Sequence, residues 1–129
     1  MKNKKLSKIQ SDWVNDLITG RFRQVQDQLA RKMEGGHVGY CCLGVACVVA
    51  KRHGIELKKT IDHTDIRFNG LVSDLPVEIL KELKLMNSTG KLKRMYKGYR
   101  SLAEMNDGGM THVEIGEYIK ANKTNVFKF

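Results

Sequence analysis

The segment YCCLGVACVVA, residues 40–50, is the longest apolar run of the 129-residue chain, and it carries all three cysteines. Gly39 precedes it, and basic residues followed by Gly54 close it where a helix typically ends. These flanks predict a buried helix over residues 41–52, although the valines and Gly44 leave a buried strand as the alternative. Gly44 also permits close packing against another element. The other helices are therefore expected to pack around this segment.

Apolar residues recur at helical spacing in other parts of the chain. Several signals mark helix ends, such as Pro76 in a first turn, the capping-box pair Thr111 and Glu114, and the glycines that follow Asp107. The predicted helices cover about residues 6–18, about residues 76–84, the segment SLAEMNDGG, and a last stretch from Thr111 through Ile119.

Weaker alternation between these helices predicts strands and hairpins. The segment RFRQVQDQLARKM is expected to be a strand or an irregular arm that enters the loop EGGHVG, and GKLKRMYKGYR is expected to be an exposed strand. A short strand is predicted at residues 55–57, followed by a loop or hairpin that ends at the turn signal Asn69-Gly70. Together these elements predict an α+β fold, with helices packed around a central CCLGVACVVA helix and a small antiparallel sheet or hairpins.

Length and composition indicate a single small domain over residues 1–129, with residues 1–5 and 124–129 as candidate flexible ends. No apolar run approaches the roughly 20 residues of a membrane-spanning helix. The basic start MKNKKLSKIQ is not followed by the apolar core of a secretory signal. These features predict a cytoplasmic protein without a membrane partner, in which three cysteines, an odd number, stay free thiols.

The formal net charge is +9, and its excess is N-terminal. Residues 1–60 hold 12 Lys and Arg against 5 Asp and Glu, whereas residues 61–129 hold 11 against 9. Such a surplus attracts anions, including nucleic acid, nucleotides or an acidic protein surface. Solubility alone is the alternative explanation, and the sequence leaves both open.

The cysteines are weakly suited to a metal site. On a helix, the adjacent side chains of Cys41 and Cys42 diverge by about 100 degrees, and Cys42 and Cys47 diverge by roughly 140 degrees. Zinc sites usually space paired thiolates two residues apart, with a second pair or histidines at a recognisable distance. The sequence therefore favours buried structural thiols and predicts no metal and no cofactor. A reactive thiolate at Cys41 or Cys42, near a helix N-terminus, remains the alternative.

Other motifs give weak signals for chemistry. No carboxylate pair, Ser/His/Asp order or acidic cluster indicates an active site, so the protein is predicted not to be an enzyme. Gly35-Gly36 is a candidate anion cradle, with a flexible hairpin loop as the alternative. The two C-terminal helices have the layout of a helix-turn-helix reader, although Glu114 and Glu117 favour simple packing of a helical hairpin.

Four segments, in order, resemble a widespread group of small bacteriophage and prophage proteins. They are WVNDLITGRFRQ, the core GYCCLGVACVVA, LPVEILKELKL and the close SLAEMNDGGMTHVEIGEYI. The resemblance covers most of the chain and implies a viral accessory protein that acts in the host bacterial cytoplasm. It carries no catalytic or binding residues to transfer. The chain departs from the pattern at Val48, where relatives often place an acidic residue, so no role for a charge is inferred there.

The leading hypothesis is a non-enzymatic phage accessory protein, for host takeover or anti-defence, that binds an anionic host component such as a nucleotide or nucleotide-derived signal. Basic residues are expected to surround a pocket, with a glycine loop as its lid or cradle and a tyrosine that stacks on a base. The candidate ligand-binding residues are Arg21, Arg23, Lys32, Gly35, Gly36, Tyr40 and Arg52.

Two alternatives stay open. The first is a nucleic-acid-binding protein that uses the basic and aromatic segment before the C-terminal helices. Its candidate residues are Lys91, Lys93, Arg94, Tyr96, Lys97, Tyr99 and Arg100. The second is an inhibitor that docks on a host protein through an apolar patch. A homo-oligomer is compatible with each hypothesis.

Overall fold

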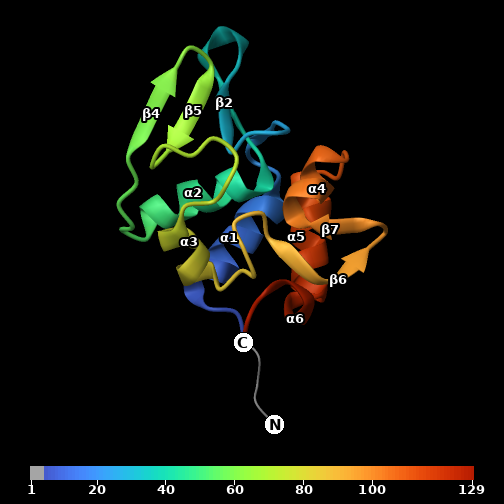
Figure 1. Ribbon diagram of the computed structural model, residues 1–129. Helices are drawn as coiled ribbons and strands as arrows, with labels where there is room; N and C mark the ends of the chain where they lie inside the picture. Colours follow the sequence, from blue (N-terminus) through green and yellow to red (C-terminus); the bar gives the residue numbers. More distant parts are fainter. Residues whose placement is uncertain (1–4) are drawn as a thin grey trace.

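The computed structural model describes residues 5–129 and confirms an α+β fold (Figure 1). The helices are α1 (Lys8–Thr19), α2 (Cys42–Arg52), α3 (Val77–Leu83), α4 (Leu102–Asp107), α5 (His112–Ala121) and α6 (Lys123–Val126), with a 3-10 turn η1 (Glu34–Gly36). The strands are β1 (Arg23–Gln24), β2 (Ala30–Lys32), β3 (Val38–Tyr40), β4 (Lys59–Asp62), β5 (Asp65–Phe68), β6 (Lys91–Tyr96) and β7 (Tyr99–Ser101). Part of the candidate flexible start, residues 1–4, lies outside the described residues.

The apolar run forms α2, so the helix prediction is confirmed and the strand alternative is wrong. Eight of the 11 residues of α2 are buried. The thiol of Cys41 caps the helix by accepting a hydrogen bond from the Gly44 backbone N–H at 3.4 Å, and Lys51 and Arg52 lie in the last turn. Cations there complement the negative end of the helix dipole. A helix satisfies its own backbone polar groups, which lets this segment cross the core.

Helix α1 lies against α2 and α5. Its first turn is closed by a capping box between Ser7 and Gln10, and Gly20, with φ of 63°, ends it in the left-handed region. The indole N–H of Trp13 donates to the Cys42 carbonyl at 2.9 Å. On the other side, Gly116 of α5 is so close to α1 that a Cβ there would stand 2.9 Å from the Leu17 Cβ. These contacts place α1 in the centre of the helical core.

The larger sheet has five strands in the order β1-β3-β2-β5-β4. Strand β3 pairs antiparallel with β2 and parallel with β1, so the sheet is mixed rather than wholly antiparallel. The reason is that the chain turns back through η1 and inserts β3 between β1 and β2. Hairpin β4–β5 continues the sheet and confirms the predicted hairpin before Asn69-Gly70.

The strand predicted at residues 55–57 is wrong. This stretch is a loop that joins α2 to β4, and the Ile55 N–H donates to the Ala50 carbonyl at 3.0 Å. Its backbone therefore closes the C-terminal end of α2 instead of joining a sheet. The side chains of Ile55 and Leu57 pack against the core, which explains their apolar character.

Asn106 joins the C-terminal half of the chain to the core. Its buried side-chain oxygen accepts hydrogen bonds from the Cys42 N–H at 3.0 Å and from the Gln24 amide at 2.8 Å. Its amide nitrogen donates to the Val25 carbonyl at 2.8 Å. Because one side chain satisfies three groups on two segments, α4 is held against the start of α2 and the end of β1.

The candidate flexible C-terminal end, residues 124–129, contains two buried side chains, those of Val126 and Phe127. Helix α6 follows α5, and both of these side chains are buried. Phe127 meets Trp13 edge-on, with ring centroids 6.1 Å apart. Burial of an aromatic ring in the core offsets the entropy lost on ordering the chain.

Candidate functional site

The residues of the leading hypothesis are spread over several elements. Arg21 and Arg52 meet at one carboxylate, since their guanidinium groups lie 3.7 Å and 2.8 Å from Asp16. Asp16 is only 7% exposed, so these two cations neutralise a nearly buried acid of α1. This carboxylate therefore offsets one of their two charges, while both arginine side chains stay exposed, at 60% and 44%.

The other five candidate ligand-binding residues do not lie at one site with Arg21 and Arg52. Arg23 is exposed on β1 and Lys32 on β2, while Gly35 and Gly36 form the η1 turn with φ of 78° and 80°. Tyr40 is half-buried and packs edge-on against Phe22 at 5.4 Å between ring centroids, and burial raises the pKa of its hydroxyl. The five cavities that we identified among residues 5–129 contain none of the seven residues in their walls.

The three cysteines are buried free thiols. Burial raises the pKa of Cys41 to about 11, despite hydrogen bonds from backbone N–H groups that favour the thiolate. Burial likewise raises the pKa values of Cys42 and Cys47. The structure therefore supports core thiols and argues against a reactive thiolate. Residues 5–129 contain no group of three or more His, Cys, Asp or Glu side chains that could hold a metal ion.

The helix-turn-helix layout is not supported by the packing. Helix α4 has six residues, and α5 buries Ile115, Gly116 and Ile119 against the core. Its capping box is confirmed, because Thr111 and Glu114 each accept a hydrogen bond from the other's backbone N–H, at 3.1 and 2.9 Å. The exposed side of α5 carries Glu114 and Glu117, which would repel phosphates.

Hairpin β6–β7 presents the cations of the alternative hypothesis. We call the exposed side chains of Lys91, Lys93, Arg94, Lys97 and Arg100 the hairpin cations. Among residues 5–129, none of the five forms an ion pair. The two strands meet at a tight turn in which Lys97 and Gly98 have φ of 50° and 83°, as two-residue hairpins require.

The tyrosines of this hairpin are partly used in packing. Tyr96 lies on Tyr118 of α5, with ring centroids 4.3 Å apart, and the Lys97 ammonium stands 5.4 Å from the Tyr96 ring centroid. The Tyr99 hydroxyl donates to the Gly108 carbonyl at 3.4 Å. Both rings therefore hold the hairpin against the helices, and neither is a free stacking platform.

A large bulge separates the two ends of the hairpin. Five residue steps on β6, from Lys91 to Tyr96, face only two steps on β7, from Ser101 to Tyr99. The backbone groups of a bulge lose their strand partners and need others. The side chain of Asn125 is the hydrogen-bond partner of the Arg94 backbone. Its oxygen accepts a hydrogen bond from the Arg94 N–H at 2.7 Å, and its amide nitrogen donates to the Arg94 carbonyl at 3.0 Å.

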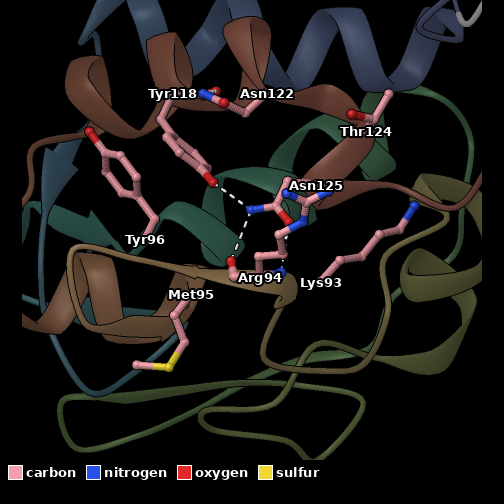
Figure 2. A pocket seen from close by; sticks show the side chains of 8 residues that line it. All are labelled: Lys93, Arg94, Met95, Tyr96, Tyr118, Asn122, Thr124 and Asn125. Atoms are coloured by element: carbon pink, nitrogen blue, oxygen red, sulfur yellow. Dashed lines mark hydrogen bonds between the residues drawn. The ribbon is translucent and has the colours of Figure 1, made fainter.

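The same amide connects the bulge to α5. Its nitrogen also donates to the Tyr118 hydroxyl at 2.7 Å, as Figure 2 shows. A cavity of about 380 Å³ lies here, between residues 93–96 of β6 and the side chains of Tyr118, Asn122, Thr124 and Asn125. The structure thus brings part of the alternative set together with polar groups from α5 and α6.

Sequence reasoning missed Tyr118, Asn122, Thr124 and Asn125 as parts of this site. The segment NKTN has the polar composition of an ordinary chain end, and residue 125 lies 31 positions from its partner Arg94. Local patterns carry no signal for such a pairing. Only the bulge, with its unpaired backbone groups, shows why an amide is needed there.

One comparison with known proteins gives a family, and none gives an activity. Neither a curated protein nor a solved structure matches the chain. A family model does match over residues 5–123, which is most of the chain. This protein therefore belongs to the family described as a domain of unknown function, DUF8296.

Proposed function

We propose that this protein binds nucleic acid through hairpin β6–β7, with the hairpin cations in contact with phosphate groups. The observation that carries the proposal is their lack of ion pairs among residues 5–129. Arg21 and Arg52, by contrast, share Asp16. When cations that form no ion pair within the protein neutralise phosphate groups, the counterions of the nucleic acid are released, and this release drives binding.

The neighbouring acids support the same reading. Glu104 accepts a hydrogen bond from the Arg100 backbone N–H at 2.5 Å, and Glu114 caps α5. Both carboxylates are thus used in backbone capping, and neither forms an ion pair with a hairpin cation within the described residues. Hydrogen bonds from Thr111 and, to a smaller extent, the charge of Lys97 lower the pKa of Glu114. The surface formed by the hairpin keeps a cationic character.

The proposed setting is that of a non-enzymatic accessory protein of a bacteriophage in the host cytoplasm. It rests on the resemblance of the four sequence segments to small phage and prophage proteins. No described helix is long and apolar enough to cross a membrane. A nucleotide ligand at Arg21, Arg52 and Tyr40 has weaker support, because the Asp16 carboxylate pairs with both arginines and offsets one of their two charges.

Fluorescence anisotropy with a labelled 12-nucleotide strand tests the proposal over a series of NaCl concentrations. If all hairpin cations contact phosphates of a single strand, the logarithm of affinity falls against the logarithm of salt with a slope of about −3.5. The double variant Lys93→Ala/Arg94→Ala should bind at least tenfold more weakly and lower the magnitude of this slope by about 0.7 per lost contact.

The matched control is Lys58→Ala/Lys59→Ala beside and on β4, which removes the same charge from the other hairpin. Both of its positions are exposed. Its affinity should stay within twofold of the wild type. No binding at 50 mM NaCl, or equal losses in the two double variants, would overturn the proposal.

A further inference from the structure

The wall of the cavity beside the β6 bulge carries a tyrosine hydroxyl whose hydrogen has no acceptor among the described residues. Tyr118 is 8% exposed, and its hydroxyl oxygen accepts a hydrogen bond from Asn125. The amide orientation is fixed, because the other end of Asn125 accepts from the Arg94 N–H. The hydroxyl hydrogen of Tyr118 has no acceptor in the described part of the chain. This hydroxyl can therefore donate a hydrogen bond to an acceptor that enters the cavity.

Neutral polar groups of α5 and of the segment that follows it line one wall of this cavity. The amide nitrogen of Asn122 donates to the Tyr118 carbonyl at 2.9 Å, which leaves its oxygen as an acceptor at the exposed side, and Thr124 adds an exposed hydroxyl. A phosphate only accepts hydrogen bonds, whereas the edge of a nucleobase presents both donors and acceptors. The mixture therefore suits a base better than a phosphate.

Two cations of β6 also line this cavity. Lys93 and Arg94 are exposed, and in Figure 2 the Arg94 side chain extends toward Asn125, while Met95 points away from α5. A volume of about 380 Å³ is at the lower end of the range for ligand sites. It suits one nucleotide unit, with the base against the neutral polar groups and the adjoining phosphates at Lys93 and Arg94.

We infer that this cavity receives one unpaired base, so that the protein prefers single-stranded nucleic acid to a duplex. The inference rests on the proposed function of the hairpin and names its substrate class. In a duplex the bases are stacked and paired, and none can enter without being extruded. A single strand offers bases to such a cavity directly, while its phosphates meet the same cations.

Fluorescence anisotropy with four probes separates binding of a base from binding of phosphates. The probes are a 12-mer of deoxythymidine, its duplex with deoxyadenosine, an abasic 12-mer, and a 12-mer of uridine. The wild type should bind the deoxythymidine strand at least tenfold more tightly than the duplex or the abasic strand. Comparison of the uridine and deoxythymidine strands shows whether the protein prefers RNA or DNA. The inference is supported if either strand binds at least tenfold more tightly than the abasic strand.

Two variants test the cavity itself. Thr124→Trp fills it from an exposed position, and Tyr118→Phe removes the hydroxyl while it keeps the ring. Each should weaken binding of the thymidine strand about tenfold and leave duplex and abasic binding unchanged. Thr60→Trp, at an exposed position of β4, is the matched control and should change neither. Circular dichroism checks that each variant is folded. If Tyr118→Phe does not fold, Thr124→Trp alone tests the cavity.

The outcomes are distinguishable. Equal affinity for the thymidine and abasic strands, or unchanged thymidine binding in Thr124→Trp, overturns the base cavity while phosphate binding by the hairpin stands. Equal or tighter binding of the duplex also overturns it. Failure of every probe to bind overturns both the inference and the proposed function.

Discussion

Gly44 lies directly against the carbonyl group of Leu29: a Cβ on residue 44 would stand 1.7 Å from the Leu29 oxygen. The same carbonyl accepts a hydrogen bond from the Cys41 N–H at 3.0 Å. One peptide group before β2 therefore fixes the first turn of α2. This close approach is the reason that the central helix needs a glycine within its apolar run.

Gly44→Ala should lower the free energy of unfolding by about 3 kcal/mol or more, because backbone on both sides must move to admit the methyl group. Urea denaturation followed by circular dichroism measures the change. Lys51→Ala, at an exposed site of the same helix, is the control and should lie within about 0.5 kcal/mol of the wild type. A Gly44→Ala protein as stable as this control would contradict the packing.

The three thiols should react slowly with a maleimide or a disulfide reagent in the native protein at pH 8. They are buried, and their raised pKa values leave little thiolate at that pH. In denaturant all three thiols should react at the rate of a cysteine in an unstructured peptide. Mass spectrometry of the labelled protein gives the number modified; rapid native labelling of Cys41 or Cys42 would restore a reactive thiol.

His112 should make stability depend on pH near neutrality. Its Nε2 lies 2.9 Å from the Tyr40 carbonyl, which requires an N–H there, and the buried Nδ1 has no partner in the described part of the chain. Burial lowers the pKa of His112 below its ordinary value of 6.5. The fold therefore favours the neutral ring, and its stabilisation is complete above pH 6.5 and lost as the pH falls through the native pKa.

Unfolding free energies of the wild type and of His112→Gln, measured from pH 7.5 to 5, test this dependence. Glutamine retains a donor for the Tyr40 carbonyl but does not titrate. The wild type should lose stability below pH 6.5, by about 1.4 kcal/mol for each unit of pKa difference, and the variant should show a smaller slope. The lowered pKa values of Asp12 and Glu114 act below their ordinary values of 3.8 and 4.5, outside this window. Parallel profiles would contradict the assignment to His112.

Phe127→Ala should destabilise the protein by about 3–5 kcal/mol, because it leaves a cavity beside Trp13. Phe129→Ala is the matched control, since this ring is 51% exposed, and it should cost less than about 1 kcal/mol. Thermal or urea unfolding compares the two. If both variants lose equally little stability, residues 124–129 do not contribute to the core and form a flexible chain end.

The sequence predicts an element correctly where the residues that interact lie close together in the chain. The apolar run with its basic and glycine flank predicts α2, and the pair Thr111 and Glu114 predicts the start of α5, because helices are capped by residues within one turn. The error at residues 55–57 has a related cause. Apolar residues that pack beneath a loop can have the spacing of a short strand.

The sequence by itself determined the α+β class, the central helix, most of the helix starts and the basic character of segment 91–100. Tertiary structure alone decided which cations are free. It placed Asp16 between Arg21 and Arg52, and it placed Asn125 on the backbone of Arg94 at the β6 bulge. Helical and strand periodicities describe each segment's own faces, whereas these pairings depend on how distant segments meet once the core is packed.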